Sequence, residues 1–414
     1  MTRLWLLGSM VLLGACGAQR VGPDAQGVMV EPGPCGRGLV VVESDYQSSN
    51  VSLLDFGGNV LSASLASSST EGSGFGVALS GDVVPAASLE LGPSIALIDR
   101  YPAGVLRFID LATAHLAAEL SVGTGFRANP QDYLALDEHK AYVARYESNP
   151  NAGRQEWDGG GDVLIVDPTV PAITGRIDLA EAMAGEAAGF SPHPARLVRA
   201  EGRVFALLAS YADVYTNGGT SSRVVELDPK TDSIVSSLVL DGLRGCDALA
   251  LSPDESELAV ACTGDDLSHP VSKVDHSGIV LLSLSADLTV SKTFPAHTWG
   301  EDPVGFSLDY VSSGVLLFGT LGHLDESGSV PDTLWRLDTR SGQSDAVLHS
   351  ERSPFTLGAV RCAASCGACF AADAERLGGS VLRFEVDSAG ALSTPTAIVA
   401  EARVGLPPRY LSVF

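Results

Sequence analysis

Paired cysteines are the side chains whose type and spacing point most directly to chemistry. Cys246 and Cys262 stand at equal distances from a turn at residues 253–255, and Cys362 and Cys369 flank a short segment in the same way. Each pair can face across one hairpin, and exported proteins oxidise such pairs. Two hairpin disulfides are therefore expected, each contributing about 2–4 kcal/mol to the free energy of unfolding.

Two further cysteines remain in the body of the chain, Cys35 and Cys366. A bond between them would fasten the N-terminal segment to a tight turn near the C-terminus. A bond from Cys35 to Cys369 is the alternative, because sequence spacing alone does not fix disulfide connectivity.

Two acidic loops raise the question of a metal. Asp158 and Asp162 are separated by three glycines, and Asp265 and Asp266 are adjacent. Carboxylates this close can bind Ca²⁺, but neither segment has the spacing of a twelve-residue Ca²⁺ loop. Solvated turns have the same composition, so no cofactor is expected and Ca²⁺ is the alternative.

Composition excludes several classes of protein. The 414 residues carry 26 Lys and Arg against 50 Asp and Glu, a net charge of −24, and 45% are hydrophobic. Nucleic acid is excluded as a partner, because no basic surface can form. The sequence also has no Gly-x-Ser-x-Gly elbow, no phosphate-binding glycine loop and no zinc-protease histidine pair.

The first residues have the features of an export signal. Residues 1–15 begin with a positive start at Arg3 and continue through a ten-residue apolar run at 4–13. That run is too short to span a bilayer and has the length of a signal-peptide core. It ends in Leu-Gly-Ala before Cys16, which resembles the lipobox of bacterial lipoproteins. The resemblance implies cleavage before Cys16 and lipidation of that residue; an ordinary signal peptide is the alternative.

Localisation follows from the same resemblance. Gly17 stands where an Asp tends to retain such lipoproteins at the inner membrane, so the resemblance implies an outer-membrane lipoprotein, facing the periplasm or the cell surface. Residues 16–37 are expected to be the lipidated Cys16 and a flexible tether, because five Gly and three Pro follow it. A chain of this kind reaches roughly 25 Å.

The rest of the chain, residues 38–414, repeats one pattern. Seven apolar strands, most of them ending in an acid, recur at intervals of roughly 55 residues. A second strand pair precedes most of them and begins at Pro85, Pro130, Pro194 or Pro303, or at Cys246. Four strands in each of seven units predict an all-β, seven-bladed β-propeller. A two-domain array of sandwiches is the alternative.

The chain ends are expected to share one blade. Residues 408–414 have the pattern of an innermost strand, and residues 38–43, 50–55 and 60–65 supply the other three. Such sharing closes the ring and leaves no open sheet edge.

The repeats resemble the YVTN-type repeats of seven-bladed bacterial propellers. Residues 141–144 and 252–254 carry the nearest matches, and the resemblance covers about residues 38–414. It implies the fold. For function it implies only a choice, because this blade geometry serves both lactonase-like enzymes and assembly scaffolds.

Loop lengths predict a binding face. The loops between second and third strands are long, at residues 145–162, 211–222, 264–277 and 319–332. Long loops on a rigid scaffold are where binding residues usually lie, although insertions also accumulate there without function. The loop-face candidates are Tyr146, Trp157, Tyr211, Tyr215, His269, His276 and His323.

The residues just before each inner strand are expected to surround the channel mouth on that face. They are Arg127, Asn129, His193, Arg244, Asp247, Asp302 and Arg409. Such a set could hold an anionic or polar ligand, or only channel water. His193, Asp302 and Arg409 could also form a catalytic group of the lactonase-like kind.

The sequence thus predicts an exported, lipid-anchored propeller that acts as a non-enzymatic binding or scaffold protein at the outer membrane or cell surface. An envelope protein is the expected partner. The first alternative is a lactonase-like hydrolase, and the second is a purely structural envelope protein.

Overall fold

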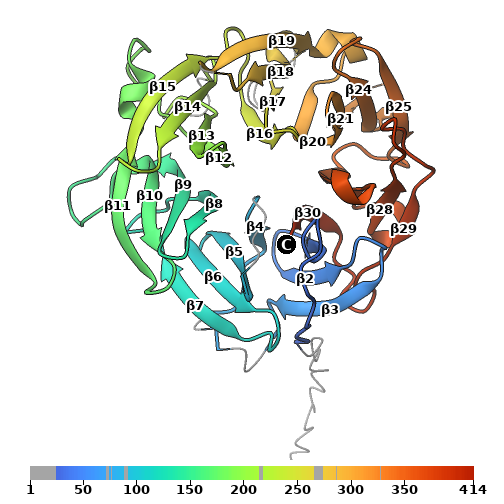
Figure 1. Cartoon of the computed structure of the whole chain (residues 1–414), viewed down its shortest axis with the longest axis horizontal. Helices are drawn as coiled ribbons and strands as arrows, with labels where there is room; N and C mark the ends of the chain where they lie inside the picture. Colours follow the sequence, from blue (N-terminus) through green and yellow to red (C-terminus); the bar gives the residue numbers. More distant parts are fainter. Residues whose placement is uncertain are drawn as a thin grey trace, which may run out of the picture.

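Seven four-stranded antiparallel sheets surround a central axis in the computed structural model (Figure 1). The structure describes residues 25–70, 74–75, 77–87, 92–213, 218–264, 274–285, 287–326 and 328–414. This arrangement is the predicted seven-bladed β-propeller.

The strands of each blade run from the channel outward. Blade 1 contains β30 (Pro408–Val413), β1 (Leu39–Ser44), β2 (Ser49–Leu54) and β3 (Val60–Ser67). Blade 2 contains β4 (Asp82–Pro85), β5 (Ser94–Tyr101), β6 (Val105–Asp110) and β7 (Leu116–Ser121). Blade 3 contains β8 (Pro130–Asp137), β9 (Lys140–Ser148), β10 (Gly160–Asp167) and β11 (Ala172–Asp178). Blade 4 contains β12 (Pro194–Ala200), β13 (Arg203–Leu208), β14 (Arg223–Asp228) and β15 (Ser233–Val239).

The remaining blades follow the same plan. Blade 5 contains β16 (Cys246–Leu251), β17 (Glu257–Thr263), β18 (Ser277–Ser283) and β19 (Thr289–Pro295). Blade 6 contains β20 (Val304–Ser312), β21 (Val315–Thr320), β24 (Thr333–Asp338) and β25 (Ser344–His349), with the extra hairpin β22 (His323–Asp325) and β23 (Gly328–Val330). Blade 7 contains β26 (Leu357–Ala363), β27 (Ala368–Asp373), β28 (Ser380–Glu385) and β29 (Thr396–Ile398). Short 3-10 helices lie in the connections: η1 (Ala180–Met183), η3 (Val274–His276), η4 (Ala296–Trp299), η5 (Ala364–Cys366) and η6 (Arg376–Gly378).

Blade 1 is built from both ends of the chain, as predicted. The C-terminal β30 is its innermost strand, at the centre of the ring in Figure 1, and pairs with β1 through Leu39↔Val413 and Val41↔Leu411. The last strand therefore closes the ring by backbone hydrogen bonds.

One prediction about strand position is wrong. The inner strand of blade 2 was expected to begin at Pro85, but β4 ends there. The buried Val83 and Val84 occupy the positions that pair with β5, so the strand lies three residues earlier. An inner strand is an edge strand, where proline is tolerated at either end. Proline alone therefore does not fix the register.

The core lies between adjacent blades. The second strands are almost completely buried, whereas the outer strand β15 is mostly exposed. Between blades 5 and 6, for example, Ile279, Leu281 and Phe318 pack together with Trp299, whose ring lies 4.6 Å from that of Phe318. Runs of Val, Leu and Ala form these strands because both of their faces are covered.

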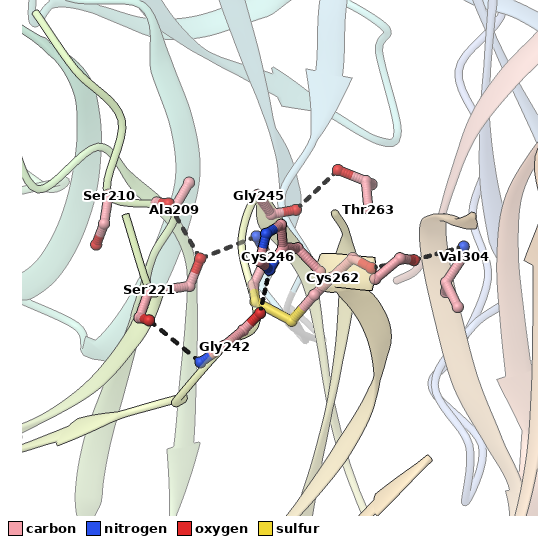
Figure 2. The surroundings of a disulfide bond; sticks show 12 residues. Ala209, Ser210, Ser221, Gly242, Gly245, Cys246, Cys262, Thr263 and Val304 are labelled. Carbon is pink, nitrogen blue, oxygen red and sulfur yellow. Dashed lines mark hydrogen bonds between the residues drawn. A yellow bond between two sulfur atoms is a disulfide. The ribbon is translucent and has the colours of Figure 1, made fainter. Parts of the chain in front are cut away.

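Buried hydroxyl groups join neighbouring blades (Figure 2). Ser222, just before β14, donates to the Ala209 carbonyl at 3.0 Å and accepts from the Cys246 amide of the next blade at 3.2 Å. Ser277 repeats this role one blade later, towards the Val304 amide at 2.9 Å. Each hydroxyl satisfies a buried backbone group that the sheet ladder leaves free.

The prediction of disulfide bonds is confirmed. Cys246–Cys262 and Cys362–Cys369 each join paired strands, with Cα–Cα distances of 3.7 and 4.0 Å. The third bond is Cys35–Cys366 and not the alternative with Cys369. Three disulfides indicate an oxidising, exported environment.

Part of the expected tether lies against the propeller. The Val28 amide donates to the Leu111 carbonyl at 2.6 Å, the Gln26 amide donates to the Ser64 carbonyl at 2.9 Å, and Cys35 is covalently held. Residues 25–37 are therefore held against blades 1 and 2 and joined to blade 7 through Cys35. These backbone hydrogen bonds and the disulfide offset the flexibility that Gly and Pro would otherwise give the segment. The signal segment 1–15, Cys16 and the other residues before 25 lie outside the described residues.

We call one side of the ring the long-loop face. It carries the loops between the second and third strands of each blade and the connections from blade to blade, including η3, η4 and the β22–β23 hairpin. The opposite side carries short turns, such as residues 138–139 and 201–202. In the part of the chain that the structure describes, no helix has the length and apolarity needed to cross a membrane.

Candidate functional site

A cavity of about 460 Å³ lies on the axis of the ring, and residues of all seven blades line it. It forms because side chains of the inner strands alternate between the blade interfaces and the channel. Its wall combines apolar groups such as Pro85, Leu249 and Leu411 with charged side chains at a few positions. This composition is typical of small-molecule sites.

Two acids in the inner strands hold the wall together. Asp132 in β8 accepts from the Leu197 amide of blade 4 at 2.9 Å and from the Ala87 amide of blade 2 at 3.1 Å. Asp309 in β20 accepts from the Cys362 amide of blade 7 at 2.8 Å. Burial raises the pKa of both carboxyls, while nearby arginines and these amides lower it. Their oxygens serve the architecture of the ring.

Arg100 at the end of β5 also belongs to the wall. Its guanidinium donates to Gln131 Oε1 at 2.9 Å and to the Tyr410 hydroxyl at 3.0 Å, and it forms an ion pair with Asp82. It therefore connects blades 1, 2 and 3 around the cavity.

Three of the predicted channel-mouth residues line this cavity: Asn129, Asp247 and Arg409. Arg409 Nη1 donates to the Phe355 carbonyl at 3.3 Å, and its guanidinium lies 5.3 Å from the centre of the Tyr46 ring. Burial raises the pKa of Asp247 to about 6, although positive charges on nearby arginines lower it.

The other four predicted mouth residues lie outside the cavity wall: Arg127, His193, Arg244 and Asp302. Arg127 stacks over the Tyr101 ring at 5.1 Å. His193 is 2% exposed and packs against the Tyr146 ring at 4.7 Å, with Nδ1 3.0 Å from the Ser191 carbonyl. Its positive φ of 50° places it in the left-handed region, outside the alternation of the strand.

The expected catalytic group is therefore not assembled around the cavity. Asp302 interacts with His323 at 2.7 Å, His193 is buried beside Tyr146, and only Arg409 lines the wall. Burial lowers the pKa of His193. General acid–base chemistry needs these groups within reach of one substrate atom.

The loop-face candidates are divided among different environments. Tyr146 lines the cavity, Tyr211 is buried, and His276 Nδ1 lies 2.9 Å from the Gly242 carbonyl. His323 is the partner of Asp302. Tyr215 and His269 lie outside the described residues.

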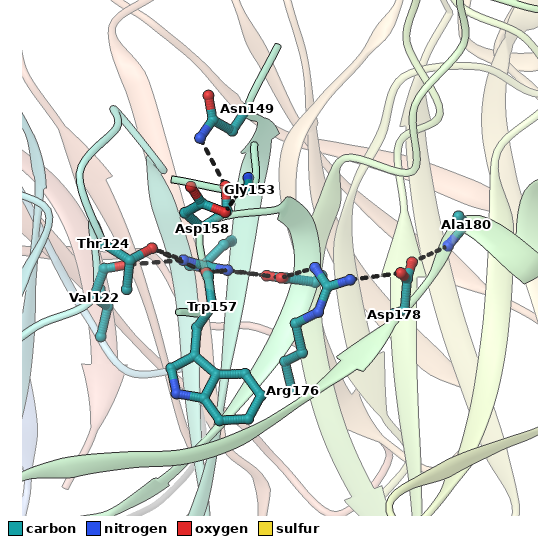
Figure 3. Close-up of polar contacts among 11 residues, drawn as sticks. Val122, Thr124, Asn149, Gly153, Trp157, Asp158, Arg176, Asp178 and Ala180 are labelled. Atoms are coloured by element: carbon teal, nitrogen blue, oxygen red, sulfur yellow. Dashed lines mark hydrogen bonds and ion pairs between the residues drawn. The ribbon is translucent and has the colours of Figure 1, made fainter. Parts of the chain in front are cut away.

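The loop that carries Trp157 is rigidly held (Figure 3). Arg145 pairs with Asp162 at 2.7 Å, where both side chains are fully buried, and donates to the Trp157 carbonyl at 2.6 Å. Asp158 accepts from three successive backbone amides at residues 153–155. These bonds lower the pKa of Asp158.

The acidic loop thus has an internal structural role. Asp162 also forms an ion pair with Arg176 at 3.2 Å, and Asp158 accepts hydrogen bonds from backbone amides. The two carboxylates that the calcium alternative requires therefore already have partners within the protein. Within the described ranges, no group of three His, Cys, Asp or Glu is placed to hold a metal. Asp265 and Asp266 lie outside those ranges.

A second hollow of about 760 Å³ adjoins this loop, and Asn129 borders both hollows. Its other lining residues are mainly polar and include Arg127, Gln155 and Asp158.

Exposed apolar side chains also gather on the long-loop face. They come from loops and strand ends: Tyr46, Phe306 and Phe355 line the cavity, and Tyr101, Leu324 and Leu377 lie elsewhere on this face.

The sequence analysis missed Arg100, Arg196 and Arg361, which line the cavity. Two of them lie within inner strands rather than before them: Arg196 in β12 and Arg361 in β26. A charged residue inside an apolar inner strand was the available signal, since the alternation of that strand directs it to the channel.

Comparisons with known proteins show the fold alone. No protein-family model matches the chain, and comparison with curated proteins gives no match. Among solved structures, a Lactobacillus plantarum protein is 12% identical with a TM-score of 0.57, covering 90% of this chain and 98% of that one. A Bacteroides uniformis protein, provisionally assigned as a 6-phosphogluconolactonase, is 13% identical with a TM-score of 0.54, covering 90% and 98%.

A eukaryotic structure is equally similar. The β-propeller domain of Myceliophteria thermophila Cps50 (Swd1) is 14% identical with a TM-score of 0.54, covering 81% of this chain and 94% of that domain. The structural similarity to such different proteins supports the propeller architecture. At identities this low, the activities of those proteins are not evidence for the activity of this chain.

Proposed function

We propose that this chain is an exported, lipid-anchored, non-enzymatic binding protein of the outer membrane or cell surface. The lipid on Cys16 is its attachment, an envelope protein is its partner, and the long-loop face is its binding surface. The resemblance of its repeats to the YVTN type supports this proposal, because a rigid ring that presents long loops on one face suits binding.

The observation that carries this proposal is the set of exposed apolar side chains on the long-loop face, of which Tyr46, Phe306 and Phe355 line the cavity. Phe306 and Phe355 are 53% and 52% exposed, and Leu324 is 72% exposed, all on the long-loop face. Aromatic anchors beside a pocket are characteristic of binding surfaces. The purely structural alternative predicts neither a concave pocket nor such a set, so it has less support.

The hydrolase alternative also has less support. Its residues His193 and Asp302 are held by Tyr146 and His323 away from the cavity wall. The 6-phosphogluconolactonase assignment of one similar structure is compatible with the shared fold, at 13% identity.

Export and anchoring are supported by the disulfides and by the lipobox before Cys16. The test is the intact mass of the protein extracted from native membranes, for the wild type and for Cys16→Ala, with Ser9→Ala as a control that leaves the box unchanged. We expect a cleaved, acylated mass in the wild type and Ser9→Ala, and its loss in Cys16→Ala. An unacylated wild-type mass would overturn the anchor.

A further inference from the structure

Two arginines that line the cavity form no ion pair with the described residues. Arg196 in β12 and Arg361 in β26 reach it from blades 4 and 7, and no carboxylate oxygen of the described residues lies within 4.0 Å of either guanidinium. By contrast, Arg100 in the same wall is paired with Asp82.

Most of their hydrogen-bonding capacity is unused. Arg196 Nη1 donates to the Ala195 carbonyl at 2.9 Å and to the Gln131 carbonyl at 3.3 Å, and Arg361 Nη1 donates to the Val360 carbonyl at 3.0 Å. Arg361 Nε is buried without an acceptor. A guanidinium offers five N–H donors, so both side chains can donate further hydrogen bonds to a ligand in the cavity.

The positive charges of these arginines also lie close enough to repel one another. Burial lowers the pKa of Arg196, and the positive charges of Arg361 and Arg100 lower it further, while Asp132 and Asp247 oppose this. The acid Asp132 is already engaged by backbone amides. An anion between the arginines would relieve the repulsion.

Asp247 supplies a different group to the same cavity. It lies in β16 on the wall and makes no hydrogen bond with the described residues. The charges of Arg196 and Arg100 act on this carboxyl. A carboxyl in the same cavity as arginines suits a ligand that carries both an anionic group and a hydroxyl.

We propose that the central cavity binds a small hydroxylated carboxylic acid, with its carboxylate between Arg196 and Arg361 and a hydroxyl hydrogen-bonded to Asp247. A monocarboxylate fits better than a dianionic phosphate, because the carboxyl groups of Asp132 and Asp247 line the same cavity and oppose a second negative charge on the ligand. The volume of about 460 Å³ accommodates such a molecule together with water or a longer carbon chain, and Leu249 and Leu411 supply apolar wall beside it.

The test is isothermal titration calorimetry on the full membrane-extracted protein in detergent. The probes are lactate, propionate, which lacks the hydroxyl, and inorganic phosphate. We expect binding of lactate, weaker binding of propionate and the weakest binding of phosphate. Arg196→Gln and Arg361→Gln should each weaken lactate binding at least tenfold, while Arg340→Gln, an exposed arginine on a turn, should leave it unchanged.

Asp247→Asn tests the hydroxyl contact without removing an arginine. It should reduce the preference for lactate over propionate about tenfold. Arg361→Lys keeps the charge and should retain part of the affinity, which covers a failure of Arg361→Gln to fold. The absence of lactate binding up to about 10 mM, or equal affinity in the wild type and in folded Arg196→Gln and Arg361→Gln, would overturn the proposal.

This inference rests on the proposed binding role and deepens it, and the two fail separately. Acylation of Cys16 does not depend on the cavity, so an acylated protein that binds no lactate would contradict the ligand and leave the anchored binding protein in place.

Discussion

Asp332 shows how one buried acid organises several backbone segments. It is 1% exposed and accepts from the amides of Gly322, Phe355, Thr356 and Leu357 at 2.7–2.9 Å. Asp332→Ala leaves four amides without this acceptor and should lower the free energy of unfolding by about 3 kcal/mol. Urea unfolding measures this.

The matched control for that substitution is Asp345→Ala, because the Asp345 side chain is 79% exposed. We expect a change within about 0.5 kcal/mol. Equal losses in the two variants would contradict the role given to Asp332.

Glu43 makes stability depend on pH. It is 3% exposed at the end of β1 and accepts from Asn50 Nδ2 at 2.5 Å and from Ser52 Oγ at 3.0 Å. Burial nevertheless raises its pKa from 4.5 to about 7, with a further rise from the charge of Glu401. The native state therefore binds the proton more tightly than the unfolded state does. The contribution of the protonated Glu43 to the free energy of unfolding is therefore complete below pH 4.5 and is lost as the pH rises to about 7.

Glu43→Gln isolates this effect from all other carboxyls. Relative to wild type, the variant should gain on the order of 3 kcal/mol between pH 4.5 and 7. Urea unfolding at several pH values measures the difference, and the exposed Glu138→Gln is the control. A wild-type-minus-variant difference that does not change with pH would contradict the burial of a protonated Glu43.

At the residue scale, the sequence predicted the cysteines well and the cavity in part. Spacing determines which cysteines can meet across a hairpin. It does not determine side-chain direction at a strand end, where the left-handed φ of His193 removes it from the channel. Arg196 and Arg361 were not predicted because they lie inside the inner strands, whereas the predicted residues lie just before those strands.

At the element scale, the β16–β17 hairpin is held by Cys246–Cys262, 16 residues apart. Replacing both cysteines by Ser should lower the free energy of unfolding by about 3 kcal/mol, by the chain-entropy relation. Unfolding of the oxidised wild type and the double variant measures this. No difference between them would show that strand pairing alone fixes the hairpin.

Strands were predictable because a half-buried or fully buried sheet imposes its period on the sequence. The closing blade followed from the same pattern at both ends. The position of β4 was not predictable in this way, because a proline is compatible with several strand registers. The β22–β23 hairpin was not predictable either, because a long loop can adopt many conformations.

At the scale of the whole molecule, the Cys35–Cys366 disulfide spans 331 residues and joins the N-terminal segment to blade 7. The same entropy relation gives a larger effect than for the hairpin bond, about 6 kcal/mol. The Cys35→Ser, Cys366→Ser variant should therefore unfold at clearly lower urea than the Cys246→Ser, Cys262→Ser variant. The reverse order would contradict a stapling role.

The proposed function requires that the long-loop face is the binding surface. Its most direct test is quantitative affinity purification from native envelopes. The face variant is Phe306→Glu with Phe355→Glu, and the rim control is Val235→Glu with Val290→Glu, on exposed outer strands. We predict one envelope protein near a one-to-one ratio with the wild type and the rim control, reduced at least tenfold with the face variant. Equal recovery by both variants, or no stoichiometric partner for the wild type, would contradict the claim.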